Sequence, residues 1–243
     1  VTLKNINFIN GKTSSNGGAI YTGISSVTVN NSTFNNNQAT GNDGGNGGAI
    51  YSWNGNVTVT NSTFKDNTAI ASGSGFGGAI YTNTGSVTVV DSKFTNCRAS
   101  SGSDIYSSTG NIDLICNDYD GKTTYTPSTE VSGTVKKYII SGTFAEVQYR
   151  INTTEDKGIL NLENKKYTAI NSDSTINVNK NITINGNGAT LDADNKFRIM
   201  NITNGVSVTL KNINFINGKD TSSSGGGAIY NSGSVTVTNS SFT

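Results

Sequence analysis

The chain has 243 residues, and its 17 Lys and Arg residues nearly balance its 16 Asp and Glu residues. A near-neutral chain gives no electrostatic basis for binding nucleic acid or an anionic membrane, and no apolar run approaches the roughly 20 residues of a membrane-spanning helix. Apolar residues make up only 33% of the chain. This would favour disorder, but the β-branched and aromatic residues recur at fixed intervals.

The first half of the chain repeats the motif Gly-Gly-Ala-Ile-Tyr. It stands at Gly17–Tyr21, Gly47–Tyr51 and Gly77–Tyr81, with a diverged copy at Gly102–Tyr106 and a later one at Gly226–Tyr230. The first three steps are 30, 30 and 25 residues. A short alternating strand (Val-Thr-Val or Ile-Asp-Leu) follows each copy, and an aromatic residue follows each strand. Three short strands per period without a helix are typical of a coil of stacked parallel strands.

The repeat therefore predicts an all-β fold, a right-handed parallel β-helix with three sheets and Gly/Asn-rich turns. We interpret residues 1–119 as the C-terminal rungs of one β-helix. One side of each strand faces a narrow lumen, and the Gly pairs are expected where the coil turns a corner. The side chains expected inside are Ile20, Val27, Val29 and Phe34, with Phe34, Phe64 and Phe94 in one buried stack.

Two cysteines, Cys97 and Cys116, stand near the end of this coil, and histidine is absent. Two thiols form neither a disulfide framework nor a thiolate metal site, so no metal is expected. The spacing leaves open a Cys97–Cys116 disulfide bond and two buried free thiols.

Residues 120–142 contain the only Pro of the chain. We interpret them as a connector that includes a strand near Val135–Ile140.

A short capping helix is predicted from Thr143 onward. Thr143 and Glu146 form a capping box, and Phe144, Val147 and Ile151 follow at helical spacing. The helix is expected to plug the open end of a second coil, because a terminal rung exposes apolar lumen and unpaired strand edges.

The second coil follows this helix, so residues 143–243 are interpreted as a cap and the N-terminal rungs of the next β-helix. Ile182 and Ile184 align with Val208 and Leu210 at a step of 26 residues.

One twelve-residue segment, VTLKNINFINGK, occurs at Val1–Lys12 and again at Val208–Lys219. Packing alone would tolerate Val/Ile exchanges, so complete identity indicates recent duplication. The chain starts in mid-pattern and is expected to be a window of a tandem β-helix array whose neighbours repeat it. The competing interpretation is a single protein whose two coils share ancestry.

The periods "GGAIY…VTV…NSTF" and the opening "TFAEVQYRI…NITINGNGATLDADNKFRI…VTLKNINFINGK" resemble the adhesin-like surface proteins of methanogenic archaea. These are parallel β-helix proteins of the pectate-lyase-like class, and the resemblance covers residues 1–115 and 143–243. The Gly-Gly-Ala-Ile element is also similar to that of chlamydial polymorphic membrane proteins. The resemblance implies an extracellular location at the cell surface and a role in attachment. It does not decide function, because enzymes share this coil.

Catalysis is not expected. Polysaccharide-cleaving β-helices need clustered carboxylates, or Asp clusters that hold Ca²⁺ beside an Arg or Lys base. The acids Asp43, Asp66, Asp91, Asp113 and Asp192 fall in different registers, and the only arginines are Arg98, Arg150 and Arg198. Alternating acids at Asp118/Asp120 and at Asp192/Asp194 are compatible with weak calcium sites, but solvated turns are the favoured interpretation.

The Tyr after each Gly-Gly-Ala-Ile strand is expected to point outward, because Ile20 points inward and strand residues alternate. The candidate binding residues are Tyr21, Tyr51, Tyr81 and Tyr230, extended by Trp53. Such a ladder either stabilises neighbouring rungs or offers a flat aromatic strip for glycans or lateral fibre contacts.

N-glycosylation sequons are frequent, and Asn also suits turns. The candidates for glycosylation are Asn30, Asn31, Asn56, Asn61, Asn152, Asn181, Asn201 and Asn239.

The leading hypothesis is a structural cell-surface protein, the repeating unit of a long β-helical fibre or stalk that mediates adhesion. Its expected partners are end-to-end copies of itself, surface glycans or other cells, and no cofactor is expected. The alternative is a carbohydrate-binding or polysaccharide-cleaving β-helix.

Overall fold

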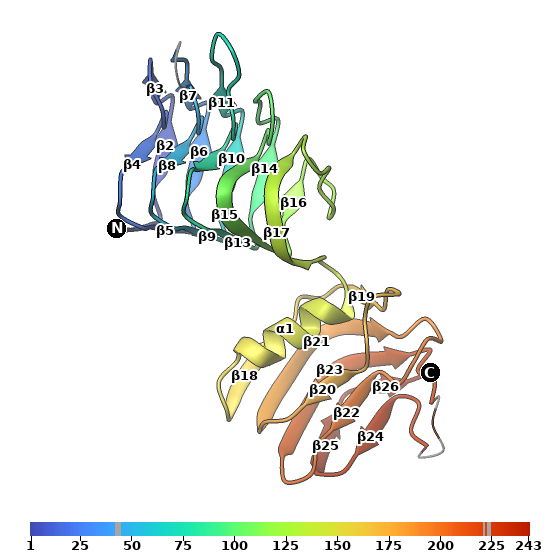
Figure 1. Ribbon diagram of the computed structural model, residues 1–243. Coiled ribbons are helices and arrows are strands. Elements are labelled where there is room, and N and C mark those ends of the chain that lie inside the picture. The colour runs from blue at the N-terminus through green and yellow to red at the C-terminus, as the bar shows by residue number, and fades with distance from the viewer. Residues whose placement is uncertain (42–44, 221, 223–224) are drawn as a thin grey trace. The chain divides into compact units, whose positions relative to one another are not determined.

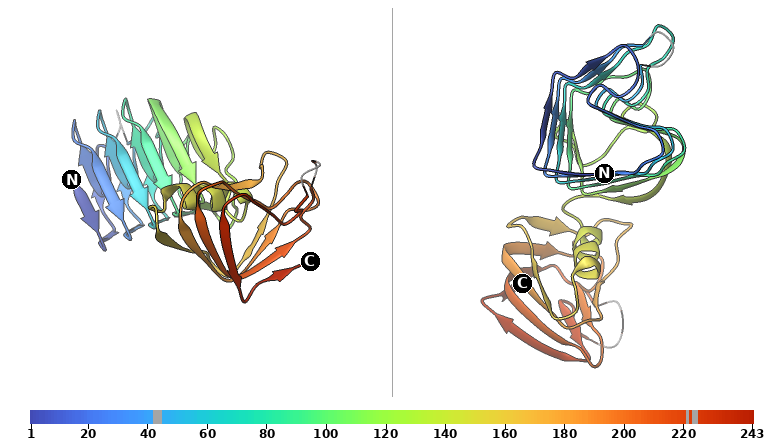
Figure 2. Two further views of the ribbon diagram at one scale, coloured as in Figure 1. Left: turned by 90° about the horizontal axis from the view of Figure 1, so that it is seen from below. Right: turned by 90° about the vertical axis from the view of Figure 1, so that its left-hand side faces the viewer.

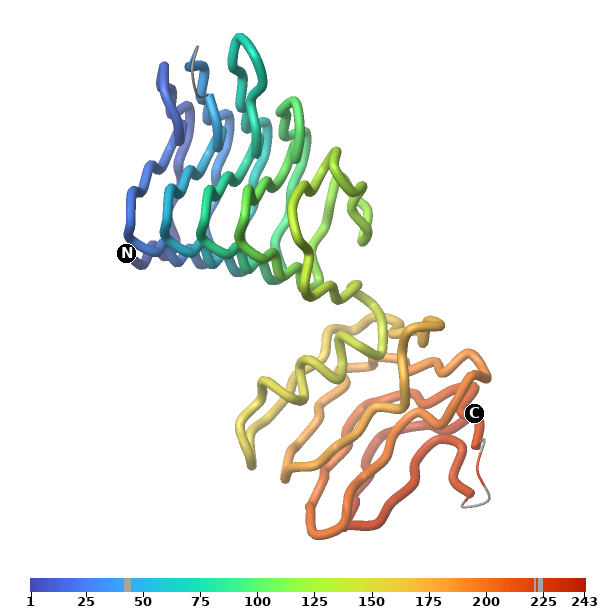
Figure 3. Tube along the Cα trace, in the orientation of Figure 1, coloured from blue at the N-terminus to red at the C-terminus, as the bar shows by residue number. Residues whose placement is uncertain are grey.

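Both predicted coils are present in the computed structural model, which describes residues 1–41, 45–220, 222 and 225–243. The chain divides into two units, Val1–Ile140 and Ser141–Thr243. Each unit stacks parallel β-strands around an apolar interior. Figure 1 shows the successive rungs of each unit as strands side by side, and Figure 3 traces the chain through them. The predicted parallel β-helix is confirmed.

The described residues of unit 1 form the predicted three sheets, but they contain four rows of strands, one more than the three strands expected in each period. The Gly-Gly-Ala-Ile row contains β4 (Ile20–Thr22), β8 (Ile50–Ser52) and β12 (Ile80–Thr82). The Val-Thr-Val row contains β1 (Thr2–Lys4), β5 (Val27–Asn30), β9 (Val57–Thr60) and β13 (Val87–Val90). The aromatic row contains β2 (Asn7–Ile9), β6 (Thr33–Asn35), β10 (Thr63–Lys65), β14 (Lys93–Thr95) and β16 (Asp118–Tyr119). The unpredicted row contains β3 (Lys12–Thr13), β7 (Gln38–Ala39) and β11 (Thr68–Ala69). Two-residue strands are too short to show an alternating pattern.

The rungs of unit 1 stack in register, so equivalent side chains lie over one another. Phe34 pairs with Phe64, and Phe64 pairs with Phe94. Their rings stack with centroids 4.7 and 5.1 Å apart, and Phe8 and Tyr119 extend the stack at its two ends. The three central Phe side chains and Val29 are fully buried, as predicted, and Val27 is 2% exposed. Ile20, also predicted inside, lies in the first rung and is partly buried against the same core. The end-on view of this coil appears in the right panel of Figure 2.

The corners of the coil use two kinds of residue with left-handed backbone. Gly47 has a φ of 63°, and a Cβ on the next residue, Gly48, would lie 2.1 Å from the Gly78 carbonyl oxygen. The first Gly of the pair therefore makes the turn, and the second allows close stacking. At the corner before the aromatic row, Asn31 and Asn61 have φ values of 46° and 48°. Asn tolerates this conformation better than other side chains.

The end of unit 1 includes most of the segment predicted as a connector. β15 (Ile105–Ile115) continues both the Gly-Gly-Ala-Ile and the Val-Thr-Val rows. β17 (Val131–Ile139) pairs with β15 along its length, with Ile112 opposite Val135. The predicted strand near Val135–Ile140 is therefore a rung strand of the coil. Tyr125 packs on Tyr119 at the end of the aromatic stack.

Unit 2 begins with the predicted helix, α1 (Phe144–Thr153). Thr143 Oγ1 accepts a hydrogen bond from the Glu146 amide at 3.4 Å, and Glu146 Oε2 accepts one from the Gly142 amide at 2.7 Å. The apolar face of α1, which includes Val147 and Ile151, is buried in the core of the unit. The helix packs on strands of the first rung, so the predicted plug is confirmed.

The strands of unit 2 form two sheets around one core. The larger sheet contains β18 (Gly158–Asn161), β19 (Lys166–Thr168), β21 (Ile182–Asp192), β23 (Ser207–Ile216), β25 (Ser234–Thr238) and β26 (Ser241–Phe242). The smaller sheet contains β20 (Ile176–Val178), β22 (Met200–Ile202) and β24 (Ile229–Asn231). Ile182 lies opposite Val208 and Ile184 opposite Leu210, as the 26-residue step predicted.

Candidate functional site

The predicted tyrosine ladder of unit 1 exists, but its interior is buried. The rings of Tyr21, Tyr51, Tyr81 and Tyr106 stack with centroids 5.0 to 5.4 Å apart. Tyr21 is 60% exposed, whereas Tyr51 and Tyr81 are 3% and 8% exposed. The prediction of an outward, accessible strip is therefore wrong for Tyr51 and Tyr81, because the rings of adjacent rungs cover both of their faces. Burial, together with the adjacent Tyr81 and Tyr21 phenols, raises the pKa of Tyr51 to about 12.

Two other predicted members of the strip stand apart from this ladder. Tyr230 belongs to unit 2, where its ring lies 4.8 Å from the Arg198 guanidinium. Trp53 follows β8 and is 48% exposed. Its amide donates a hydrogen bond to the Thr22 carbonyl, so it is held against the preceding rung. The accessible aromatic surface of unit 1 at this corner thus comes from Tyr21 and Trp53.

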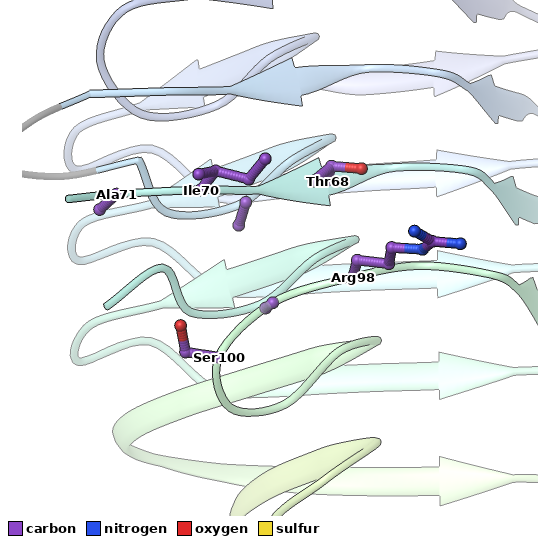
Figure 4. Close-up of a pocket in the computed structure, with 7 residues that line it drawn as sticks. Thr68, Ile70, Ala71, Arg98 and Ser100 are labelled. Atoms are coloured by element: carbon purple, nitrogen blue, oxygen red, sulfur yellow. The ribbon is translucent and has the colours of Figure 1, made fainter. Parts of the chain in front are cut away.

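A notch of about 280 Å³ lies beside β11, on the outer side of unit 1. Figure 4 shows its lining, with Thr68 and Arg98 toward one end and Ile70, Ala71 and Ser100 toward the other. Ile70 is 51% exposed, and Ala69 beside it is buried. No sequence pattern had indicated this site.

The notch arises because one loop is shorter than its neighbour. In the third rung, seven residues separate Ala69 from Gly77, while in the fourth only two separate Ala99 from Gly102. Thr68 still pairs with Arg98 across the two rungs. The longer loop therefore overhangs the shorter one. The drop in step from 30 to 25 residues was the available signal.

A buried acid stands at the last rungs of unit 1, where sequence reasoning had singled out nothing. Asp104 is 3% exposed and takes the place that Ala79 has one rung earlier. Burial, and then the Glu130 and Asp120 carboxylates, raise the pKa of Asp104 to about 8. Tyr119 Oη is buried nearby without a hydrogen-bond partner among the described residues. The change from Gly-Gly-Ala-Ile to Gly-Ser-Asp-Ile was the signal for this site.

Neither cysteine forms a disulfide bond, so the buried-thiol alternative holds. Cys97 follows the aromatic row and stands one rung beyond Asn67, whose Nδ2 lies 3.9 Å from its Sγ. Cys116 lies at the corner before that row, next to Ile115 in β15. The two residues therefore occupy different corners. Burial, with a smaller effect of the Asp104 charge, raises the pKa of Cys97 to about 12.

The acids proposed as weak calcium ligands are engaged within the protein. Asp118 accepts a hydrogen bond from the Gly121 amide and pairs with Lys93 at 3.3 Å. Asp192 pairs with Lys166 at 2.6 Å and accepts hydrogen bonds from Asn217 and the Asp194 amide.

Within the described ranges, no group of three or more acidic, Cys or His side chains is arranged to hold a metal ion. Asp43, one of the acids considered for catalysis, lies outside the described residues. In the same ranges, no helix has both the length and the apolar character needed to cross a membrane.

The predicted sequons differ in how their side chains are used. In most of them the side-chain nitrogen donates to an adjacent rung; these are Asn31, Asn61, Asn181, Asn201 and Asn239. Within the described residues, Asn56 and Asn152 engage only the side-chain oxygen, which accepts from the Ser86 amide and from Gln148 Nε2 respectively. Their glycosylation stays a prediction.

Comparison with known proteins supports a likeness within unit 1. Residues 31–52 and 61–83 match the Chlamydia polymorphic membrane protein repeat. Each segment begins at an Asn corner and includes an aromatic strand and the next Gly-Gly-Ala-Ile strand. No curated protein and no solved structure matches the chain. The chain therefore carries segments similar to this repeat, and the resemblance to archaeal adhesin-like proteins stays a prediction.

Proposed function

We propose that the protein is a structural cell-surface protein, a repeating unit of a β-helical fibre or stalk that mediates adhesion. The observation that carries this proposal is the reuse of one identical segment in two coils. Leu3 pairs with Val29 as Leu210 pairs with Val237, and Phe8 pairs with Phe34 as Phe215 pairs with Phe242. A unit that recurs with the same pairing is suited to extension along one axis.

A location at the cell surface is supported by the matched repeat, whose name is that of a membrane protein of Chlamydia. Attachment to other cells or to surface glycans belongs to the same proposal. The partners along the fibre axis are further copies of the same unit.

A role without catalysis is part of the proposal. Several acids of the second coil are held in ion pairs, as Glu146 is by Arg150 and Lys165, and Asp220 by Arg198. A general acid or base must instead reach the substrate.

Labelling of intact cells tests this proposal. Antibodies against unit 1 are expected to label unbroken source cells and to reduce their attachment to a surface, while an antibody against an internal protein labels only lysed cells. Labelling confined to lysed cells would contradict the surface role, and full labelling without any effect on attachment would contradict the adhesive one.

A further inference from the structure

The lining of the notch beside β11 combines methyl groups with one cation. Ala69, Ala71 and Ala99 contribute methyl groups, and Ile70 adds an exposed aliphatic side chain. Among the described residues of the lining, Arg98 alone is charged. A complementary ligand therefore carries both an apolar group and a negative charge.

The Arg98 guanidinium is held in one orientation. Its Nε and Nη2 donate to Asn96 Oδ1 at 3.3 and 3.1 Å, and Asn96 is itself fixed by hydrogen bonds to Asp66 and Asp120. Arg98 Nη1 donates to no described residue. An oriented guanidinium with N–H groups still available is well suited to a carboxylate.

The cation and the exposed aliphatic side chain of the lining lie toward different ends of the notch. Arg98 lies toward one end of the notch, beside Thr68, while Ile70 and Ala71 lie toward the other end (Figure 4). A sugar acid would bring several hydroxyl groups, each of which needs a partner when it is buried. In the part of the lining that the structure describes, only Thr68 and Ser100 carry hydroxyl groups. A carboxylate attached to a small apolar side chain matches the notch better.

We propose that this notch binds the C-terminal carboxylate of a partner protein whose last residue is small and apolar. The carboxylate lies on Arg98, and the terminal side chain lies against Ile70 and the alanines. Recognition of a chain terminus in this way is a common mode of peptide binding. The proposal goes beyond the fibre role. It does not depend on that role, because peptide binding is measured on the purified chain alone.

Peptide titration of the purified, isotopically labelled chain tests the proposal by NMR. The probe is a short peptide that ends in Ala-Val, used as the free acid and as the C-terminal amide. The free acid is expected to give saturable shifts at Ala69–Ala71 and Arg98–Ser100, with the amide about tenfold weaker or more. Equal binding of acid and amide, no binding, or shifts confined to other residues would overturn the proposal.

Variants at Arg98 separate its role from a general effect of charge. Arg98→Gln is expected to weaken binding of the acid about tenfold or more, and Arg98→Lys to weaken it several-fold, because Lys lacks the planar fork. Lys4→Gln, which removes another exposed cation outside the notch, is the matched control and leaves binding unchanged. Binding that survives Arg98→Gln overturns the proposal.

Lengthening the short loop gives an independent test. Insertion of Ala-Ser-Gly-Ser-Gly after Ala99 copies the residues of the longer loop at 71–75 and is expected to cover the notch. The variant should keep its strand spectrum and lose the peptide shifts. Retained binding would overturn the proposal, as would tighter binding of an oligogalacturonate than of the peptide acid, which would make a sugar acid the ligand.

Discussion

Asp104 occupies in the fourth rung of unit 1 the position that Ala79 occupies in the third. The two residues directly precede the paired strands β12 and β15, and the Ala79 amide donates to the Asp104 carbonyl at 3.2 Å. Both side chains are buried, at 0% and 3% exposure. A carboxyl group thus replaces the methyl group of the earlier rungs, and the next rung places Glu130 at the equivalent position.

This substitution makes the stability of the protein depend on pH. Folding raises the pKa of Asp104 from its ordinary value of 3.8 to about 8. Because the folded state holds this proton more tightly, the contribution of Asp104 to the free energy of unfolding is expected to be greatest below about pH 4 and to be lost as the pH rises through about 8. The other titratable groups around it are Glu130, Asp120, Cys97 and Tyr119.

Asp104→Ala, which restores the residue of the earlier rungs, is expected to remove this fall and to be more stable than the parent at about pH 9. Urea unfolding across the pH range measures both effects. Asp113→Ala, at a half-buried acid of β15, is the control and keeps the parental profile. An unchanged profile in Asp104→Ala would show that Asp104 titrates normally.

Truncation of a ring inside the aromatic stack is expected to destabilise the protein strongly. Phe64 is fully buried between Phe34 and Phe94, so Phe64→Ala is expected to lower the free energy of unfolding by about 3–5 kcal/mol. Lys65→Ala, at the exposed neighbour on the same strand, should change it little. A cost near zero for Phe64→Ala would mean that the ring is not in the lumen.

Corner residues give a prediction about backbone conformation, drawn from two variants that both lose the Asn61–Asn31 side-chain hydrogen bond. Asn61 has a φ of 48°, and a residue with a Cβ loses about 1–2 kcal/mol there unless its side chain compensates locally. Asn61→Ala is expected to destabilise unit 1 by that amount, whereas Asn61→Gly is expected to be nearly neutral. Thermal unfolding compares the two variants, and equal melting temperatures would contradict the argument.

Absence of catalysis is tested with a panel of acidic and neutral polysaccharides, with and without Ca²⁺. No lyase or hydrolase turnover is expected, because the carboxylates are paired or scattered over different registers. Reproducible turnover that a single Asp→Ala change abolishes would contradict the structural role.

The coil could be predicted from the sequence because the same kind of side chain recurs at the same position of each repeat. Val29, Val59 and Val89 recur at equal steps, and each is buried. The helix could be predicted because Thr143 and Glu146 carry a local capping signal that does not depend on tertiary contacts.

Other features depend on contacts between neighbouring rungs. The sequence pattern of a single rung does not reveal these contacts. Tyr51 and Tyr21 have the same place in the repeat, yet one is buried and the other exposed, because only Tyr51 has a ring on each side. The notch at Arg98 likewise arises from a difference between two loops.

Electron microscopy of the native material tests the central claim most directly. The claim is that β-helical units like these follow one another along a single axis, with rungs about 4.8 Å apart within each unit. The expected result is a thin fibre at the cell surface with one regular axial repeat many rungs long. Compact, monodisperse particles the size of a single unit, without any fibre, would contradict the account.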